Sequence, residues 1–456
     1  MYLKWGMSVA VIFILIMSQL QGFVDCGLCE TEPLDDSFED GLSEGYTLFG
    51  PTFSTKTYLL DMEGRIVHTW SSIHRQALGI YLLENGYLLR SCSPHLSLNF
   101  ISGGYSGNVE LLDWNSTVIW QFTHSSDIYR LHNDIEPLPN GNVLMISWEV
   151  KTYEEAVAAG CDPRLIQHGE VWSDYIIEVK PNGSSGGDIV WEWHVWDHLI
   201  QDFDPGKNNY GVVAEHPELI DINFKRDFKG LANYFSILGG RDFVHLNSLD
   251  YNETFDQILV GARNINEIWV IDHNTTSEEA TSHVGGSYGR GGDLLYRWGN
   301  PQVYGAGDAS DRQLFAQHDA RWVEAGCPGE GHITLFNNGW MRPGLDYSSV
   351  LEIVPPIDDN GEYYLEDKES YGPDLPIWEY KHENPVLFYS KMMSSAQRLP
   401  NGNTLICSGW HKGIFIEVNM EKEIVWRYDN LRPFPYINSV FKIQRYPSDY
   451  LGIEIN

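Results

Sequence analysis

The chain has 456 residues and a formal net charge of −33, with 63 Asp and Glu residues against 30 Lys and Arg residues. This charge repels nucleic-acid phosphates and anionic lipid headgroups, and it excludes nucleic acid as an expected partner. Any site for an anionic small molecule must therefore be locally basic. Hydrophobic residues make up 43% of the sequence and aromatic residues 13%, which is enough for the core of one all-β domain.

The N-terminus carries an apolar run at residues 9–17, after Lys4. This pattern predicts a signal peptide or an N-terminal anchor within residues 1–25. The run is shorter than the about 20 apolar residues of a membrane span, which favours the signal peptide. We therefore expect a secreted or extracytoplasmic protein that contacts a membrane only through an uncleaved anchor. The sequons that agree with export and glycosylation begin at Asn115, Asn182, Asn252 and Asn274.

An N-terminal segment, residues 26–47, precedes a region of repeated hairpins. One half of the repeat alternates apolar residues around a turn and ends on an aromatic residue. Its six copies are residues 58–70, 109–122, 175–193, 268–298, 350–380 and 414–428. The other half is a second hairpin, clearest at residues 134–147 and 396–408, where Asn-Gly supplies a left-handed turn. Its weaker copies are residues 80–90, 245–263, 318–337 and 437–446.

Two hairpins in each of six repeats predict an all-β fold, a six-bladed β-propeller with four-stranded blades over residues 48–456. Helical signals are scarce, and short helices are expected only at residues 152–159 and 216–221. The alternative is an ordinary pair of β-sandwiches. Sandwiches rarely repeat one aromatic-terminated hairpin so many times, which favours the propeller.

The cysteines do not indicate a metal centre. The Cys-x-x-Cys pair at residues 26–29 has no second pair, so a zinc site is not predicted there. Cys92 and Cys407 lie in predicted strands and are interpreted as core thiols. Cys161 and Cys327 each follow a glycine in a loop, and a disulfide between them is compatible with export.

Three histidines, His132, His245 and His318, open stretches that lead into apolar strands. In a propeller, equivalent positions of different blades meet at one end of the axis, so three imidazoles are expected to converge. The start of the first strand of an antiparallel hairpin lies beside the end of the second. This brings Asn247 and Arg263 close to His245. By the same reasoning, the other neighbours expected at this rim are Trp148, Asn337, Ser395, Trp410 and His411.

This set suits a tetrahedral oxyanion. Arginine offers a planar fork of donors to sulfate, phosphate or carboxylate oxygens, and histidine can act as a nucleophile, acid or donor near neutral pH. Three histidines also make a zinc site, but Arg263 beside them would repel the ion, so no metal and no cofactor is predicted. Two structural alternatives stay open: the histidines tie neighbouring blades together, and Arg263 forms an ion pair with Asp272 or Glu267.

A glycine-rich stretch at residues 285–292 has the composition of a phosphate-binding loop. It lacks the helix that should follow such a loop, so an outer-hairpin loop is the preferred interpretation.

At these residues the chain resembles the arylsulfotransferase (arylsulfate sulfotransferase) family, over roughly residues 45–446. The resemblance rests on residues 132–134, 245–247, 260–272 and 317–320. Members of the family form six-bladed propellers and move a sulfuryl group from a phenolic sulfate ester to another phenol without phosphoadenylyl sulfate. The expected partners are therefore a small aryl sulfate donor and a phenolic acceptor.

By position, the resemblance implies that His318 is the nucleophile and carries the sulfuryl group as a transient sulfohistidine. The residues matched to positions that grip the sulfuryl oxygens and aid departure of the phenolate are His132, His245, Asn247 and Arg263. Ser395 is matched to a hydroxyl that the following blade contributes.

The chain also departs from the bacterial members of this family, which carry an additional N-terminal β-domain. The segment at residues 22–47 is too short to form one, and an insertion at residues 197–240 is interpreted as a lid. One rival function is an exported propeller without catalysis, acting as a binding or surface scaffold protein. A formylglycine sulfatase is disfavoured because residues 161–164 have the wrong spacing for its Cys-x-Pro-x-Arg segment.

Overall fold

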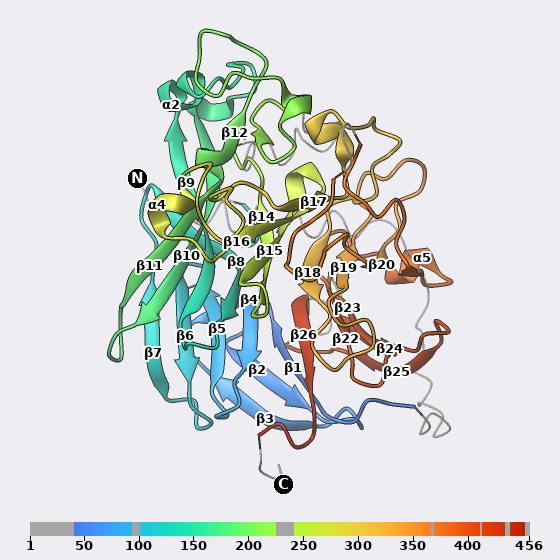
Figure 1. Cartoon of the computed structure of the whole chain (residues 1–456). Coiled ribbons are helices and arrows are strands. Elements are labelled where there is room, and N and C mark those ends of the chain that lie inside the picture. The colour runs from blue at the N-terminus through green and yellow to red at the C-terminus, as the bar shows by residue number, and fades with distance from the viewer. Residues whose placement is uncertain are drawn as a thin grey trace, which may run out of the picture. The chain divides into compact units, whose positions relative to one another are not determined.

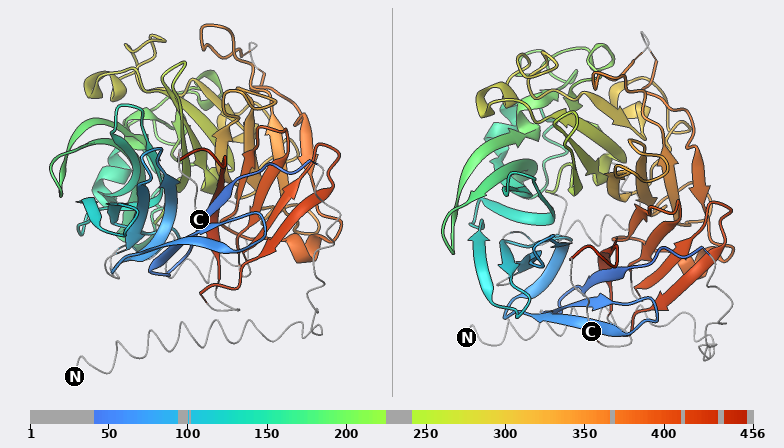
Figure 2. Two further views of the ribbon diagram at one scale, coloured as in Figure 1. Left: turned by 90° about the horizontal axis from the view of Figure 1, so that it is seen from below. Right: turned by 60° about the horizontal axis from the view of Figure 1, so that its bottom comes forward.

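The computed structural model describes residues 41–93, 100, 102–224, 241–365, 369–410, 413–433 and 438–451, all within one unit, Gly41–Asn456. The described residues form six four-stranded antiparallel sheets, arranged as blades around a central axis (Figures 1 and 2). The prediction of a six-bladed β-propeller with four-stranded blades is therefore confirmed. The predicted signal or anchor at residues 1–25 and most of the segment at residues 26–47 lie outside the described residues.

The blades are numbered along the chain, and the innermost strand is named first. Blade 1 consists of β26 (Val440–Tyr446), β1 (Tyr46–Pro51), β2 (Lys56–Leu60) and β3 (Ile66–Ser71). Blade 2 consists of β4 (Arg75–Leu82), β5 (Leu88–Ser93), β6 (Asn108–Leu112) and β7 (Val118–Thr123). Blade 3 consists of β8 (Tyr129–Pro137), β9 (Val143–Thr152), β10 (Glu170–Pro181) and β11 (Gly187–His194).

Blade 4 consists of β14 (Leu246–Asn252), β15 (Gln257–Ala262), β16 (Glu267–Asp272) and β17 (Tyr296–Trp298). Blade 5 consists of β18 (His318–Trp322), β19 (Ile333–Asn337), β20 (Ser349–Ile353) and β21 (Trp378–Tyr380). Blade 6 consists of β22 (Ser395–Arg398), β23 (Thr404–Ser408), β24 (Ile414–Val418) and β25 (Ile424–Asp429). The innermost strands of neighbouring blades contact one another and form the inner ring.

Short elements lie outside the blades. The helices are α2 (Tyr153–Ala158), α4 (Ser277–Ala280) and α5 (Pro385–Phe388), and the 3-10 turns are η2 (Gln167–Gly169), η3 (Val195–His198), η4 (Val213–Glu215), η5 (Arg263–Ile265) and η6 (Pro301–Tyr304). No helix in the described part of the chain has the length and hydropathy that a membrane span requires.

The two predicted helices had different outcomes. The helix expected at residues 152–159 is α2, which begins with a capping box between Thr152 and Glu155. The prediction of a helix at residues 216–221 was wrong. Its last residues form β13 (Ile220–Asp221), which pairs in parallel with β12 (Leu199–Ile200), so strand pairing prevails over the helical signal.

Blade 1 closes the ring by combining the two ends of the propeller. Residues 437–446 were expected to form a weak hairpin, but their described part forms the single strand β26. This strand pairs with β1, as in the partners Thr47 and Arg445. The C-terminal strand is therefore the innermost strand of a blade whose other three strands come from the N-terminal end.

The tryptophan that ends the repeat ties five of the six blades to the next, whereas Nε1 of Trp70 in blade 1 has no hydrogen-bond partner among the described residues. Indole N–H groups of outermost strands donate to backbone carbonyl oxygens of the following blade. These donors are Nε1 of Trp120 (to Gly186, 2.7 Å), Trp193 (to Gly292, 2.7 Å), Trp298 (to Pro373, 2.7 Å), Trp378 (to Met420, 3.2 Å) and Trp426 (to Met62, 2.8 Å). A buried indole needs such an acceptor, which explains why the aromatic position recurs.

The described cysteines are buried, and none of them forms a disulfide with another described cysteine. Cys92 and Cys407 lie in β5 and β23, as expected for core thiols. The disulfide considered between Cys161 and Cys327 does not form.

Candidate active site

The three predicted histidines lie beside β-bulges of inner strands. His132 lies within β8, His245 directly precedes β14, and His318 is the first residue of β18. In each of these hairpins the pairing register shifts close to the histidine. A bulge re-aims side chains and is common beside active sites. Three residues at these bulges have a left-handed backbone that non-glycine residues rarely adopt: Asn133 (φ 50°), His245 (φ 57°) and Asp319 (φ 54°).

The structure brings the imidazoles and Arg263 together. The rings of His132 and His245 have centroids 5.8 Å apart. Burial, followed by the positive charge of Arg263, lowers the pKa of His318 to about 3, and His245 contributes in the same direction. The backbone N–H of Arg263 donates to the carbonyl oxygen of His245 at 3.2 Å, which places Arg263 beside this histidine.

The hydrogen bonds of His318 determine which nitrogen carries its proton. Nδ1 lies 2.7 Å from Oδ1 of Asn338 and 3.1 Å from the carbonyl oxygen of Ala316. Both oxygens accept, so Nδ1 carries the hydrogen. With a pKa of about 3, the ring is neutral at pH 7. The lone pair is therefore on Nε2, which is the atom available for attack.

Asn338 was not predicted, although its neighbour Asn337 was. The Nδ2 group of Asn338 donates to the carbonyl oxygens of Ser390 and Met393, at 2.8 and 2.9 Å, which fixes Oδ1 toward His318. Asn337 instead accepts from the backbone N–H of Phe315 through Oδ1. The tandem asparagines at the end of β19 were the available signal, but the sequence does not tell which of them faces the histidine.

His245 forms a pair with Asp242, a second residue that was not predicted. Nδ1 of His245 is 2.6 Å from Oδ2 of Asp242. Burial alone would raise the pKa of Asp242, but the charge and hydrogen bond of His245 lower it below its usual value. Trp148 and Ser102 also donate hydrogen bonds to this carboxylate. An ionised Asp242 keeps one proton of His245 on Nδ1, so Nε2, which lies 3.3 Å from Nδ2 of Asn133, is the nitrogen that can exchange a proton with a substrate.

His132 is enclosed by protein. Its ring stacks on Trp148, with centroids 3.8 Å apart and an interplanar angle of 4°. Nδ1 is 2.9 Å from Nδ2 of Asn133, and Nε2 is 2.9 Å from Oδ1 of Asp174 without a well-directed hydrogen bond. Burial, followed by the charge of His245, lowers the pKa of His132 far below 6.5. His132 is thus neutral, and both of its nitrogens face protein groups.

Arg263 supplies the locally basic site that an anion requires. Its Nη1 donates to Oδ1 of Asn264 at 3.0 Å, and its guanidinium lies 5.3 Å from the ring centroid of Trp340. Burial lowers its pKa to about 10, so it stays charged at pH 7. The amino group of Lys391 lies on the same indole, 4.6 Å from the centroid. Neither Trp340 nor Lys391 was predicted.

The ion pairs considered for Arg263 do not form. Glu267 pairs with Arg297, at 2.5 Å, and Asp272 accepts from the backbone N–H groups of Asn274 and Ser287. Among the described residues, no carboxylate forms an ion pair with Arg263, so its remaining donors are available to an anion.

Asn247 holds the backbone next to the nucleophile. Its Nδ2 donates to the carbonyl oxygen of Gln317 at 2.7 Å, and its buried Oδ1 has no hydrogen-bond partner among the described residues. Asn247 therefore positions the residue that precedes His318. Trp410 is described, whereas His411 lies outside the described residues.

Polar side chains of the inner strands, rather than the histidines, tie neighbouring blades together. Each of them accepts a hydrogen bond from a backbone N–H of the next inner strand. The pairs are Asp134 Oδ2 with Leu249 (3.3 Å), Ser248 Oγ with Ala320 (3.2 Å), Asp319 Oδ2 with Ala396 (3.0 Å) and Ser395 Oγ with Ile443 (3.1 Å). Ser395 thus belongs to the inner ring, and none of the described contacts joins its hydroxyl to the histidines.

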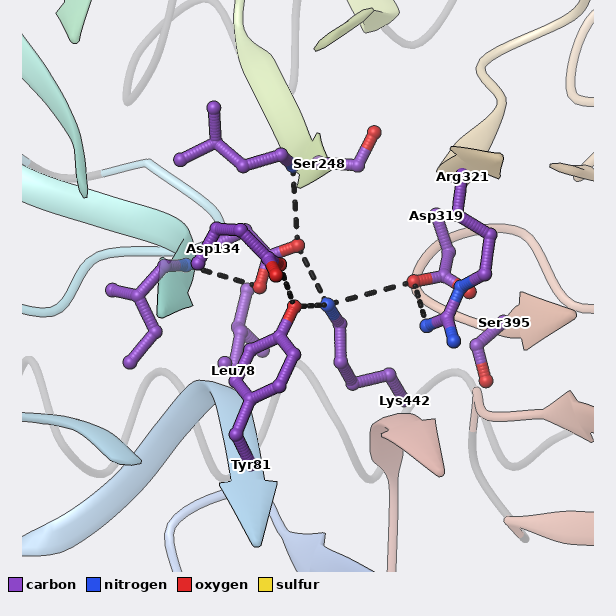
Figure 3. Close-up of polar contacts among 12 residues, drawn as sticks. Leu78, Tyr81, Asp134, Ser248, Asp319, Arg321, Ser395 and Lys442 are labelled. Atoms are coloured by element: carbon purple, nitrogen blue, oxygen red, sulfur yellow. Dashed lines mark hydrogen bonds and ion pairs between the residues drawn. The ribbon is translucent and has the colours of Figure 1, made fainter. Parts of the chain in front are cut away.

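A buried ionic cluster occupies the inner ring (Figure 3). Nζ of Lys442, from β26, is 2.8 Å from Oδ2 of Asp134 and 3.7 Å from Oδ1 of Asp319. The hydroxyl of Tyr81 accepts from the same Nζ at 3.0 Å, and Arg321 pairs with Asp319 at 2.8 Å. Asp134 and Asp319 lie two and one residues after His132 and His318, so this cluster fixes the strands that carry two of the histidines.

The comparisons with known proteins identify one family. The model of the family described as Arylsulfotransferase (ASST) matches residues 46–430. No curated protein matches the chain. Solved structures match at low identity. A protein of unknown function from Bacteroides caccae is 11% identical, with a TM-score of 0.47, over 88% of this chain and 99% of that one. AztD from Citrobacter koseri is 8% identical, with a TM-score of 0.38, over 89% and 98%.

Proposed function

The chain belongs to the arylsulfotransferase family, and on this premise we propose that it transfers a sulfuryl group from a phenolic sulfate ester to an acceptor phenol through a sulfohistidine at His318. The proposed reaction does not use phosphoadenylyl sulfate. The observation that carries the proposal is the state of His318, a neutral imidazole whose Nδ1 faces two acceptors and whose Nε2 is left as the nucleophile.

In the first proposed step, Nε2 of His318 attacks the sulfur atom of the donor. The N–S bond forms while the bond from sulfur to the aryl oxygen breaks, and the electron pair of that bond leaves with the phenolate. Arg263 stabilises charge on the sulfuryl oxygens, since its guanidinium is charged, partly buried and without a carboxylate partner among the described residues. Protonated Nε2 of His245 gives a proton to the departing phenolate.

In the second proposed step, the acceptor phenol attacks the sulfur atom of the sulfohistidine. Nε2 of His245 takes the phenolic proton, the new S–O bond forms, and the N–S bond breaks to restore neutral His318. His245 thereby returns to the state in which it started the cycle. Because the two phenols react in separate steps with one enzyme form between them, the kinetics should be ping-pong.

The other predicted residues have supporting roles in this proposal. His132 and Asn247 make hydrogen bonds to protein groups, which favours positioning over direct contact with sulfuryl oxygens. Trp340 lies beside Arg263 and offers an aromatic face for the phenolic ring of donor or acceptor.

A transfer assay tests the proposal. With p-nitrophenyl sulfate and phenol, the full chain should release nitrophenol and form phenyl sulfate, and His318→Ala should abolish both products. His216→Ala is the matched control, because His216 is half-exposed and pairs only with Glu218 in the described structure. If the wild-type protein transfers no sulfuryl group under these conditions, the result would support the alternative function, an exported propeller that acts as a binding or scaffold protein without catalysis.

Secretion is also proposed, on the basis of the apolar run at residues 9–17. N-terminal sequencing of protein collected outside the cell should give a mature chain that lacks the first residues. Intact protein that stays in the cytoplasm would contradict secretion.

A further inference from the structure

Three side chains of metal-binding type lie at the boundary between blades 3 and 4, outside the active site. His198 ends η3, which follows β11, whereas His283 and Asp293 belong to the connection from β16 to β17. Nδ1 of His198 and Nδ1 of His283 lie 2.8 and 2.7 Å from Oδ1 of Asp293. The three ligand atoms all lie within 4.8 Å of one another. We propose that this cluster binds one divalent transition-metal ion, and that two imidazoles with one carboxylate favour Zn²⁺.

The hydrogen bonds of His198 favour a cation at its Nδ1. The ring is fully buried, and its Nε2 is 2.9 Å from the carbonyl oxygen of Ala280, which can only accept. Nδ1 faces the carboxylate of Asp293. A neutral imidazole has a single N–H, so without a cation one nitrogen would direct its lone pair at an oxygen. A metal ion at Nδ1 removes this conflict, and a metal-bound histidine usually donates its other N–H to a carbonyl or carboxylate.

The glycine-rich loop at residues 285–292 is shaped around this cluster. A Cβ at Gly292 would lie 2.7 Å from Nε2 of His198 and 2.2 Å from the carbonyl oxygen of Ala280, so only glycine fits there. The loop thereby brings Asp293 against His198, with His283 at its other end. Packing around the cluster therefore accounts for the glycines. Phosphate binding does not account for them, because the helix of a phosphate-binding loop is missing.

Exposure also favours an ion at this place. The side chain of His283 is 58% exposed and that of Asp293 only 6% exposed, so an ion can enter from solvent and still meet a buried carboxylate. Trp193 shields the other side by stacking on His198, with ring centroids 5.5 Å apart. No Lys or Arg in the described part of the chain forms an ion pair with Asp293.

A second cluster with possible ligand atoms does not share these properties. Its members are His74, Cys92 and Glu110. The guanidinium of Arg90 lies 3.7 Å from Glu110 and is fully buried, so it would repel a cation.

Zinc at the first cluster would join blade 3 to blade 4, since His198 comes from one blade and the other two ligands from the next. The site has no direct contact with His318 among the described residues. Its expected effect is on stability, and it does not depend on the proposed sulfuryl transfer.

A competition titration tests the site. The full chain, stripped with a chelator, is titrated with Zn²⁺ against a chromogenic chelator. Wild type should bind one more Zn²⁺ than His283→Ala, and Asp293→Asn should weaken that binding at least about tenfold. Added Zn²⁺ should raise the Tm of wild type but leave that of His283→Ala unchanged. Because His283 is largely exposed, its loss should leave the chain folded.

The comparison between variants separates this site from others. Adventitious Zn²⁺ bound elsewhere on the chain is common to both proteins, so the difference between wild type and His283→Ala is the readout. His318→Ala and His216→Ala should keep the extra Zn²⁺, which distinguishes the cluster from the active-site histidines and from adventitious surface binding. Equal Zn²⁺ binding and equal Tm shifts in wild type and His283→Ala would overturn the proposal and leave a hydrogen-bonded cluster that holds no metal ion.

Discussion

A buried imidazole can serve as a nucleophile only if it is neutral and its free lone pair faces the substrate. At His318 both conditions follow from neighbouring atoms. Burial and the charge of Arg263 lower its pKa, and the oxygens of Asn338 and Ala316 retain the proton on Nδ1. Asn338 is fixed by its own donors, so the tautomer of the nucleophile is set by residues that do not touch substrate.

The low pKa of His318 predicts an effect on stability. The unfolded chain has a histidine pKa near 6.5 and the folded chain one of about 3. Between these values the unfolded state binds the proton and the folded state does not, so lowering the pH destabilises the protein through this residue. The stability that the protein gains from a neutral His318 is fully present above about pH 6.5. It decreases toward pH 3, by up to about 1.4 kcal/mol of unfolding free energy per pH unit.

A His318→Gln variant cannot titrate at this position. Urea unfolding at pH 7 and pH 5 should therefore show a smaller loss of unfolding free energy in the variant than in wild type. The other buried groups titrate equally in both proteins and cancel in the comparison. Equal losses in both proteins would contradict a neutral, buried His318.

The pair of Asp242 and His245 predicts that the loss of kcat in an Asp242→Asn variant depends on the leaving group of the donor. Asp242→Asn should lower kcat about 100-fold, since general acid–base catalysis contributes roughly that much, and KM should change little. The loss should be larger with phenyl sulfate than with p-nitrophenyl sulfate, because nitrophenolate leaves without a proton.

Asp256→Asn is the matched control for this prediction. Asp256 pairs with His273 through Nδ1 at 2.7 Å, but it lies in the turn between β14 and β15, at the other end of β14 from His245. The Asp256→Asn substitution should leave kcat unchanged. A similar loss in both variants, or a loss independent of the leaving group, would contradict the role of Asp242.

At the scale of elements, β26 combines two tasks, since it closes the ring and carries Lys442 into the inner cluster. Lys442→Met would leave Asp134 without its ion-pair partner. Removal of one partner from a buried pair costs about 3–5 kcal/mol, and urea unfolding should show a loss of this size. Adding Asp134→Asn should recover part of it, because the unpaired charge is then removed.

The control is Lys381→Met, because Lys381 pairs with Glu379 and is 49% exposed. An exposed pair contributes only about 0–1 kcal/mol. If Lys442→Met lowered the unfolding free energy as little as Lys381→Met does, the cluster of Figure 3 would not hold the inner ring together.

At the scale of the whole molecule, the blades could be predicted because their signals are local. The alternation, the Asn-Gly turns and the terminal aromatic residues lie within single hairpins. Closure through β26 could not be predicted, since Thr47 and Arg445 pair across almost the whole chain and no local pattern marks this. The helix expected at residues 216–221 failed for a related reason, because its partner strand lies about twenty residues away.

The same distinction applies to the active site. The structure places the rings of His132 and His245 5.8 Å apart and bonds the backbone of Arg263 to that of His245, because blade ends meet around one axis. Asp242 and Asn338 could not be found, since bulges and side-chain rotamers decide which neighbour faces a histidine. The catalytic roles of all these residues remain predictions.

The most direct test of the account is the mass of the enzyme after reaction with donor alone. Wild type mixed with p-nitrophenyl sulfate, without acceptor, should gain about 80 Da, the mass of one sulfuryl group. Peptide mapping under mild alkaline conditions should place it on His318, and added phenol should remove it. An enzyme that transfers sulfate yet never carries this group on His318 would contradict the proposed mechanism.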